Sequence, residues 1–228
     1  MNSDLQVIRV CVVICPLVRC LSGDPLNLCR TVSVWGRGFN NDHSVLDGDH
    51  PTIPCYTDSS LDHVTLKDIF AEAQALITLA SEKGITIATA ESCTGGLIGA
   101  AITAIPGSST PFKGGIIAYD NKVKHKLLGV PPGMITKYGA VSREVARAMA
   151  TGAVEALNVD MAVSVTGIAG PGGGSDDKPV GTVWMGLATR DEVTTTLFTF
   201  GDIGRNKVRD VTCYEALKAL TDTLKNKT

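Results

Sequence analysis

The chain has 228 residues, of which 44% are hydrophobic, 5% aromatic and 19% charged, and its formal net charge is −2. Near-neutral charge and scarce aromatic side chains argue against a nucleic-acid partner, which needs a basic face and platforms for base stacking. No apolar run approaches the roughly 20 residues that span a bilayer, so we predict no membrane segment.

Cysteine is distributed unevenly along the chain. Five of the seven cysteines precede residue 60, and only Cys93 and Cys213 follow it. The later part therefore has the composition of a reduced domain, and we expect the protein to be cytoplasmic. The early cysteines form no CxxC pair with a later CxxC or HxxxH partner, so we predict no zinc site.

Residues 1–64 contain four prolines and show no sustained hydrophobic period. We interpret them as a poorly ordered N-terminal extension, and we place the functional domain at 65–228. The domain opens at Thr65, which with Asp68 has the pattern of a capping box. Apolar side chains at 66, 69, 70, 73, 76 and 77 then predict one buried helical face, and Gly84 ends that helix.

Along the rest of the domain, segments with the hydrophobic pattern of a strand alternate with segments that have the pattern of a helix. We predict strands at 85–90, 114–119, 161–165, 181–188 and 193–200, and helices at 97–105, 120–128, 142–157 and 204–225. The strand at 114–119 has the composition of a buried strand. Strands interleaved with helices indicate a layered α/β/α domain, and the hairpin at 181–200 makes its sheet mixed. Small residues around Gly152 predict close packing of their helix.

Three loops, at 91–96, 119–124 and 166–175, each follow a predicted strand. Because the carboxyl ends of strands line the ligand crevice of open α/β sheets, we expect these loops to meet at one site. The first loop carries Ser92, the candidate nucleophile, directly before the glycines that open a helix. A serine hydroxyl needs a base to take its proton.

Histidine does not supply that base. His43, His50 and His63 precede the domain, and His125 lies among lysines on a helix that we expect to be exposed. A Ser-His-Asp triad is therefore disfavoured, and no G-x-S-x-G motif occurs.

Tyr119, Lys122 and Lys124 remain as bases close to a strand end. A lysine can serve if burial or nearby positive charge lowers its pKa. Each candidate also has an ordinary interpretation: the serine as a helix N-cap, the tyrosine as a core residue, the lysines as solvated surface charge. Cys93 is either a small buried hydrophobe or a rival nucleophile.

The loop at 166–175 has the composition of an anion cradle, because its glycines let backbone N–H groups turn inward and Thr166 and Ser175 add hydroxyl donors. It is neither a Walker A loop nor a dinucleotide fingerprint. Lys178, Arg205 and Arg209 can add cationic contacts, and surface charge is the alternative. Arg205 at a helix start is electrostatically disfavoured, which favours a ligand-facing or interface role.

Several motifs in order resemble one family. They include Ala90-Glu91-Ser92-Cys93-Thr94-Gly95-Gly96, Ala118-Tyr119, Thr166-Gly167-Ile168-Ala169-Gly170-Pro171 and Lys178-Pro179-Val180-Gly181-Thr182-Val183. Over about 65–226 the chain resembles the C-terminal domain of the CinA proteins, also known as nicotinamide mononucleotide deamidase. Asp120 stands where many relatives carry Ser, and residues 1–64 do not resemble the separate N-terminal nucleotide-processing domain of larger members.

The resemblance implies hydrolysis of the carboxamide of nicotinamide mononucleotide to nicotinate mononucleotide and ammonia, without metal or cofactor. It implies Ser92 as nucleophile, assisted by Tyr119 and by a lysine, for which the family pattern favours Lys124 over Lys122. It also implies a homo-oligomer. The alternative function is a non-catalytic accessory module in competence or the DNA-damage response, and a third is a generic phosphate-binding domain.

Two further sets of site residues complete this hypothesis. For the oxyanion we expect backbone N–H groups near Thr94 and Gly95. For the nucleotide's polar groups we expect Thr166, Gly167, Gly170, Gly173, Ser175 and Arg205.

Overall fold

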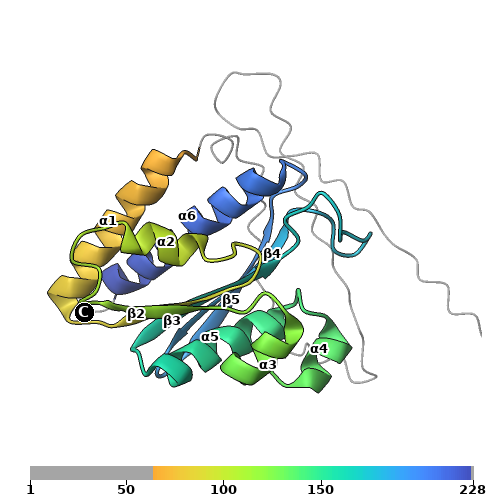
Figure 1. Ribbon diagram of the computed structural model, residues 1–228, viewed down its shortest axis with the longest axis horizontal. Helices are drawn as coiled ribbons and strands as arrows, with labels where there is room; N and C mark the ends of the chain where they lie inside the picture. Colours follow the sequence, from red (N-terminus) through yellow and green to blue (C-terminus); the bar gives the residue numbers. More distant parts are fainter. Residues whose placement is uncertain (1–63, 227–228) are drawn as a thin grey trace, which may run out of the picture. The chain divides into compact units, whose positions relative to one another are not determined.

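The computed structural model describes residues 64–226, so the expectation of a poorly ordered extension lies outside the described residues. The domain is built on one sheet of five strands in the order β2-β1-β3-β4-β5 (Figure 1). Its strands are β1 (Ile87–Glu91), β2 (Phe112–Ile117), β3 (Met161–Gly167), β4 (Thr182–Thr189) and β5 (Val193–Thr199). β1 pairs in parallel with β2 and β3, and the pairs β3–β4 and β4–β5 are antiparallel. The predicted mixed sheet and its hairpin are confirmed.

Helices cover both faces of the sheet, as predicted for an α/β/α domain (Figure 1). On one face lie α1 (Leu66–Lys83), α2 (Leu97–Thr103) and α6 (Arg205–Asn226); on the other lie α3 (Asn121–Leu128), α4 (Pro132–Tyr138) and α5 (Arg143–Leu157). The described residues thus form two hydrophobic cores, one on each side of the sheet. No helix within 64–226 is both long and apolar enough to cross a membrane.

Local sequence signals determine several helix ends. The Thr65 side chain accepts from the N–H of Asp68 while the Asp68 carboxylate bonds back to Thr65, so the predicted capping box forms. Gly84 ends α1 in the left-handed region at φ 65°, and Ser142 caps α5 by accepting from the N–H of Val145. These confirm the predicted boundaries of both helices.

Two predictions about buried surface are wrong. Leu66 and Phe70 on α1 are 59% and 42% exposed, because they lie beside the stripe of Ile69, Ala73 and Leu76 that packs on the core. β2 is an edge strand with alternating half-buried and exposed residues, so it is not the buried strand predicted at 114–119. α4 was not predicted, since none of its residues is buried and it has no apolar period to detect.

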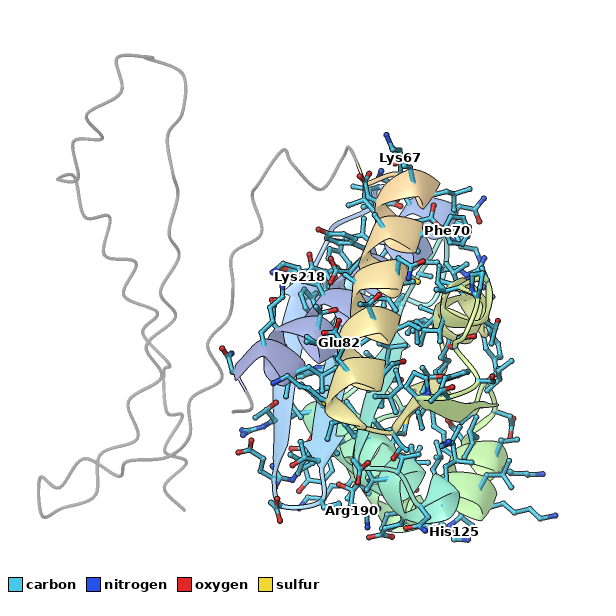
Figure 2. The ribbon with its side chains drawn as sticks, turned by 90° about the vertical axis from the view of Figure 1, so that its left-hand side faces the viewer. Lys67, Phe70, Glu82, His125, Arg190 and Lys218 are labelled. Atoms are coloured by element: carbon cyan, nitrogen blue, oxygen red, sulfur yellow. The ribbon has the colours of Figure 1, made fainter. Side chains whose placement is uncertain are left out.

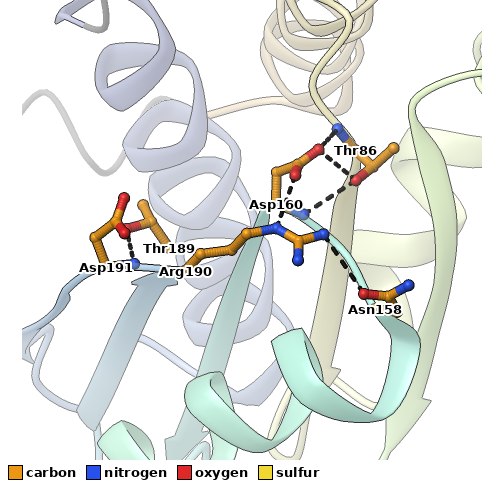
Figure 3. A network of polar contacts seen from close by, with 6 residues as sticks. All are labelled: Thr86, Asn158, Asp160, Thr189, Arg190 and Asp191. Carbon is orange, nitrogen blue, oxygen red and sulfur yellow. Dashed lines mark hydrogen bonds and ion pairs between the residues drawn. The ribbon is translucent and has the colours of Figure 1, made fainter.

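Two contacts outside the site join neighbouring elements: one packs α5 against α3, and the other links the amino ends of β1 and β3. A Cβ added to Gly152 on α5 would overlap the carbonyl group of Leu128 on α3, so the predicted close packing requires this glycine. At the amino ends of β1 and β3, Asp160 accepts from the N–H and hydroxyl of Thr86 at 2.9 and 2.6 Å and from Arg190 at 3.0 Å (Figure 3). These hydrogen bonds lower the pKa of the Asp160 carboxyl.

Candidate active site

The three loops predicted to meet do meet, at the carboxyl ends of β1 and β3. They enclose a cavity of about 190 Å³. Its lining residues are Ser92, Cys93, Tyr119, Asn121, Lys124, Ala140, Val141, Thr166, Gly167, Ala169 and Arg205. β1 lies between β2 and β3, so the chain reverses its direction across the sheet here, and ligands of open α/β sheets bind at such a point.

Lys124 lies on the inner side of α3 and is only 1% exposed. Its Nζ donates hydrogen bonds to Ser92 Oγ at 3.0 Å, to the Ala118 carbonyl at 2.7 Å and to the Tyr119 carbonyl at 3.2 Å. Within residues 64–226 no carboxylate is close enough to form an ion pair with this amine. Desolvation by burial therefore lowers the pKa of Lys124, which favours the neutral amine that a base requires.

Lys122 is exposed, and its backbone N–H donates to the Asp120 side chain that caps α3. The structure thus brings Lys124 to the serine and leaves Lys122 on the surface.

Ser92 is 8% exposed and follows β1 directly. Its N–H donates to the Val165 carbonyl at 3.0 Å, which ties the serine to the neighbouring strand β3. The interpretation of Ser92 as a helix N-cap is wrong, because the N-cap of α2 is Gly96, which has no side chain to accept a hydrogen bond. The Ser92 hydroxyl instead faces Lys124 and the cavity.

In the turn after Ser92, some backbone N–H groups donate to a carbonyl and others do not. The Gly95 N–H donates to the Ser92 carbonyl at 3.1 Å, so it is engaged within the turn. Among the described residues no backbone carbonyl accepts from the N–H groups of Cys93 and Thr94. Of the two donors expected for an oxyanion, the Thr94 N–H is thus the one that no carbonyl occupies.

Cys93 lines the cavity but is only 6% exposed. Burial raises the pKa of its thiol to about 12, so the thiolate is scarce at neutral pH. This favours the interpretation of Cys93 as a small buried hydrophobe over that of a rival nucleophile.

Tyr119 lies at the cavity mouth with 61% of its surface exposed, so its interpretation as a core residue is wrong. Its hydroxyl accepts from Arg205 at 3.2 Å, and Arg205 also donates to the Gly170 carbonyl at 2.9 Å. Arg205, at the start of α6, therefore connects the tyrosine to the glycine-rich loop across the mouth of the cavity.

The glycine-rich loop contributes only its first part to the cavity. Thr166 and Gly167 line it, and the Thr166 hydroxyl donates to the Ala140 carbonyl at 2.8 Å. Gly173 and Ser175 are exposed and do not line the cavity; the Ser175 hydroxyl accepts from the N–H of Lys178.

Each of the three predicted cations has hydrogen-bond partners, and two of the cations lie outside the cavity. Lys178 Nζ donates to the carbonyls of Tyr138 and Val141, each at 2.8 Å, and so holds the segment between α4 and α5. Arg209 donates to the Thr94 carbonyl at 3.3 Å from Nε and 2.8 Å from a terminal nitrogen. Of the three, only Arg205 lines the cavity.

The family model of the CinA C-terminal domain matches residues 70–224. The chain belongs to the CinA family. It is 53% identical over 150 residues to a CinA-like protein of Geobacter sp. (strain M21) and 48% identical over 149 residues to one of Parasynechococcus marenigrum (strain WH8102). Each match covers 65% of this chain and 36% of the relative, so the chain spans about a third of the length of these curated relatives.

Solved CinA-family structures share the fold. The competence/damage-inducible protein CihA from Agrobacterium tumefaciens is 44% identical, with a TM-score of 0.68 over 70% of this chain and 96% of that one. A CinA superfamily protein from Escherichia coli is 29% identical, with a TM-score of 0.66 over 73% and 98% of the two chains. The family resemblance inferred from the motifs is thus confirmed.

Sequence reasoning missed several residues of this CinA-family site. Asn121, Ala140 and Val141 line the cavity, and Asn121 had a usable signal, since it comes two residues after Tyr119. Ala140 and Val141 precede the Ser142 cap and have no distinguishing composition. Glu91 was noted only as part of a motif, although its buried carboxylate accepts four hydrogen bonds from the turn after Ser92 and the start of α2. No group of three or more metal-ligating side chains occurs within residues 64–226.

Proposed function

We propose that this CinA domain is an amidohydrolase that converts nicotinamide mononucleotide to nicotinate mononucleotide and ammonia. The observation that carries the proposal is the 3.0 Å hydrogen bond between Ser92 Oγ and the buried amine of Lys124. In such a pair the serine is the nucleophile and the lysine, whose pKa is lowered, is the general base, so no histidine is needed. The reaction would serve recycling of pyridine nucleotides.

In the acylation step Lys124 takes the Ser92 hydroxyl proton as Oγ attacks the carboxamide carbon. We assign the tetrahedral oxyanion to the N–H of Cys93, which lines the cavity, and to the N–H of the next residue, Thr94, in place of the engaged Gly95 N–H. Each such donor lowers the barrier by on the order of 3 kcal/mol. When the C–N bond breaks, the proton on Lys124 passes to the leaving nitrogen, with the Tyr119 hydroxyl as relay, and ammonia departs.

The second half of the reaction hydrolyses the acyl-enzyme. Lys124 is neutral again once ammonia has left, and it can take a proton from a water molecule that attacks the ester carbon. The bond to Ser92 Oγ then breaks, the serine recovers its proton from Lys124, and nicotinate mononucleotide leaves.

Substrate recognition follows from the size and charge of the cavity. Its volume of about 190 Å³ suits a small group such as a ring with its carboxamide, being below the about 300–1,000 Å³ of pockets for drug-sized ligands. The ribose phosphate would extend toward the mouth, where Arg205 offers a guanidinium and Thr166, Gly167 and Gly170 begin the glycine-rich loop. Gly173 and Ser175 could contact only the outermost part of the substrate.

Incubation of the protein with nicotinamide mononucleotide tests the proposal. We expect stoichiometric release of ammonia and nicotinate mononucleotide, identified by mass. The names of the solved relatives, competence/damage-inducible proteins, favour a second candidate, an accessory binding module. That module would bind the nucleotide or a protein partner without releasing ammonia.

A further inference from the structure

We propose that Glu91 and Arg209 are positioning residues that hold the turn at Ser92-Cys93-Thr94-Gly95-Gly96 from two sides and fix the serine against Lys124. The inference rests on the proposed function of Ser92 and assigns these two residues a part in that reaction. Neither lines the cavity, so each acts on the reaction through the turn and not through the substrate.

The inner contact comes from Glu91, the last residue of β1, which is 1% exposed. Its carboxylate accepts from the N–H groups of Gly96 at 2.9 Å, Ile98 at 3.1 Å and Gly99 at 2.8 Å. It also accepts from the hydroxyl of Thr94 at 2.7 Å. Every one of these groups is a donor. A carboxylate can accept from all of them through its two oxygens, whereas an amide would place an NH2 group, which only donates, against some of these donors.

Glu91 thereby supplies the cap that α2 lacks. The first N–H groups of a helix have no partner within it, and Gly96 at the N-cap carries no side chain. The carboxylate occupies three of these donors, the N–H groups of Gly96, Ile98 and Gly99, so the amino end of α2 holds the turn in place and does not receive the oxyanion.

The outer contact comes from Arg209 on α6. Its guanidinium donates twice to the Thr94 carbonyl, at 2.8 and 3.3 Å, on the residue whose hydroxyl is bound by Glu91. Arg205 lies one helical turn earlier and contacts Tyr119 and Gly170 instead. Two arginines on one helix therefore serve different parts of the site: Arg205 the mouth of the cavity, and Arg209 the turn.

Ser92 lies between the two residues that these contacts fix, Glu91 before it and Thr94 after it. Attack on a bound amide requires the serine oxygen to keep its place within a fraction of an ångström, and a displacement of about 1 Å can cost about 100-fold in rate. Loss of either contact is therefore expected to lower kcat while leaving substrate affinity in place.

Steady-state kinetics with nicotinamide mononucleotide test this inference on the full chain. We expect Glu91→Gln to lower kcat by about 10- to 100-fold and Arg209→Gln by about 10-fold, each with KM changed less than about threefold. Glu82→Gln, on the exposed side of α1 (Figure 2), and Arg147→Gln, on α5, are the matched controls and should retain wild-type kcat. Wild-type kcat in both test variants, or a rise in KM alone, would overturn the inference.

A milder pair of variants covers the case in which Glu91→Gln does not fold. Thr94→Val removes the 2.7 Å hydrogen bond to Glu91, whereas Thr94→Ser retains the hydroxyl. We expect kcat to fall in the valine variant and to be largely restored in the serine variant. Equal kcat in the two variants would contradict the role of this contact.

A fluorophosphonate probe separates this inference from the choice of substrate. The probe forms an Oγ–P bond at an activated serine, with fluoride leaving and the base taking the proton, and intact-protein mass measures the rate. Slower labelling of Ser92 in Glu91→Gln and Arg209→Gln supports the positioning role of these two residues even if nicotinamide mononucleotide proves not to be the substrate. Labelling at the wild-type rate contradicts it, and a wild-type protein that neither labels nor releases ammonia overturns both proposals.

Discussion

Lys124 donates a hydrogen bond to Ser92 at 3.0 Å across 32 residues of sequence, from a side chain that is almost wholly buried. The contact depends on two elements, because β1 delivers the serine and the inner face of α3 delivers the amine. A buried amine without a carboxylate partner reduces stability, since the charged form is poorly solvated there. We interpret this loss of stability as the result of a function that needs Lys124 as a neutral amine.

Lys124→Met should abolish general-base assistance. We expect ammonia release to fall by about 100- to 10,000-fold, the usual contribution of a positioned base. Lys124→Arg should not restore it, because a guanidinium stays protonated. Lys122→Met, on the exposed side of α3, is the control and should retain activity. An equal loss in the two methionine variants would argue against a specific role for Lys124.

The pH dependence of kcat/KM should report the state of Lys124. Burial lowers its pKa below the ordinary value of 10.5, and the neutral amine is the active form. Activity should therefore rise with pH through the lowered pKa and level off above it. Because the unfolded chain binds the proton more tightly, the free energy of unfolding should also rise with pH between the lowered value and about 10.5. A kcat/KM that shows no rise with pH anywhere below 10.5 would contradict the assignment.

Arg205→Gln should weaken binding of the phosphorylated substrate. A hydrogen bond to a charged group contributes about 1.5–3 kcal/mol, so we expect KM for nicotinamide mononucleotide to rise about 10- to 100-fold. Hydrolysis of nicotinamide riboside, which lacks the phosphate, should change much less in the same variant. A similar loss for both substrates would show that Arg205 acts through Tyr119 or Gly170 and not through the phosphate.

Gly152→Ala should destabilise the domain by about 1–3 kcal/mol in urea denaturation, because the added methyl group would overlap the Leu128 carbonyl. This loss should outweigh the gain in helix propensity of about 1 kcal/mol. Gly133→Ala in α4 is the matched control: its Cβ would meet nothing within 4 Å, so it should be neutral or stabilising. A stabilised Gly152→Ala variant would contradict the close packing of α3 on α5.

The sequence predicted what depends on local pattern. The cap at Ser142, the stop at Gly84 and the three loops after strands follow from residue types and spacing alone, and all are present. The count of histidines directed attention to Lys122 and Lys124, but their sequence spacing could not decide between them. That choice depends on which side of α3 faces the sheet, and the tertiary packing determines it.

The features that sequence reasoning missed depend on the exact course of a turn or on contacts between distant parts of the chain. Glu91 caps a helix that begins six residues later, so its role depends on the exact course of the turn. Arg209 reaches the Thr94 carbonyl across 115 residues of sequence, and Arg205 reaches Tyr119 across 86 residues. Neither pairing has a signal within a local window of residues.

Ammonia release from nicotinamide mononucleotide by wild-type, Ser92→Ala and Cys93→Ala proteins tests the central claim most directly. The account predicts a loss of at least about 100-fold in Ser92→Ala, because the nucleophilic route is gone. Cys93→Ala should stay within about threefold of wild type, since burial raises the pKa of that thiol to about 12. Retained turnover in folded Ser92→Ala, with a loss in Cys93→Ala, would contradict it.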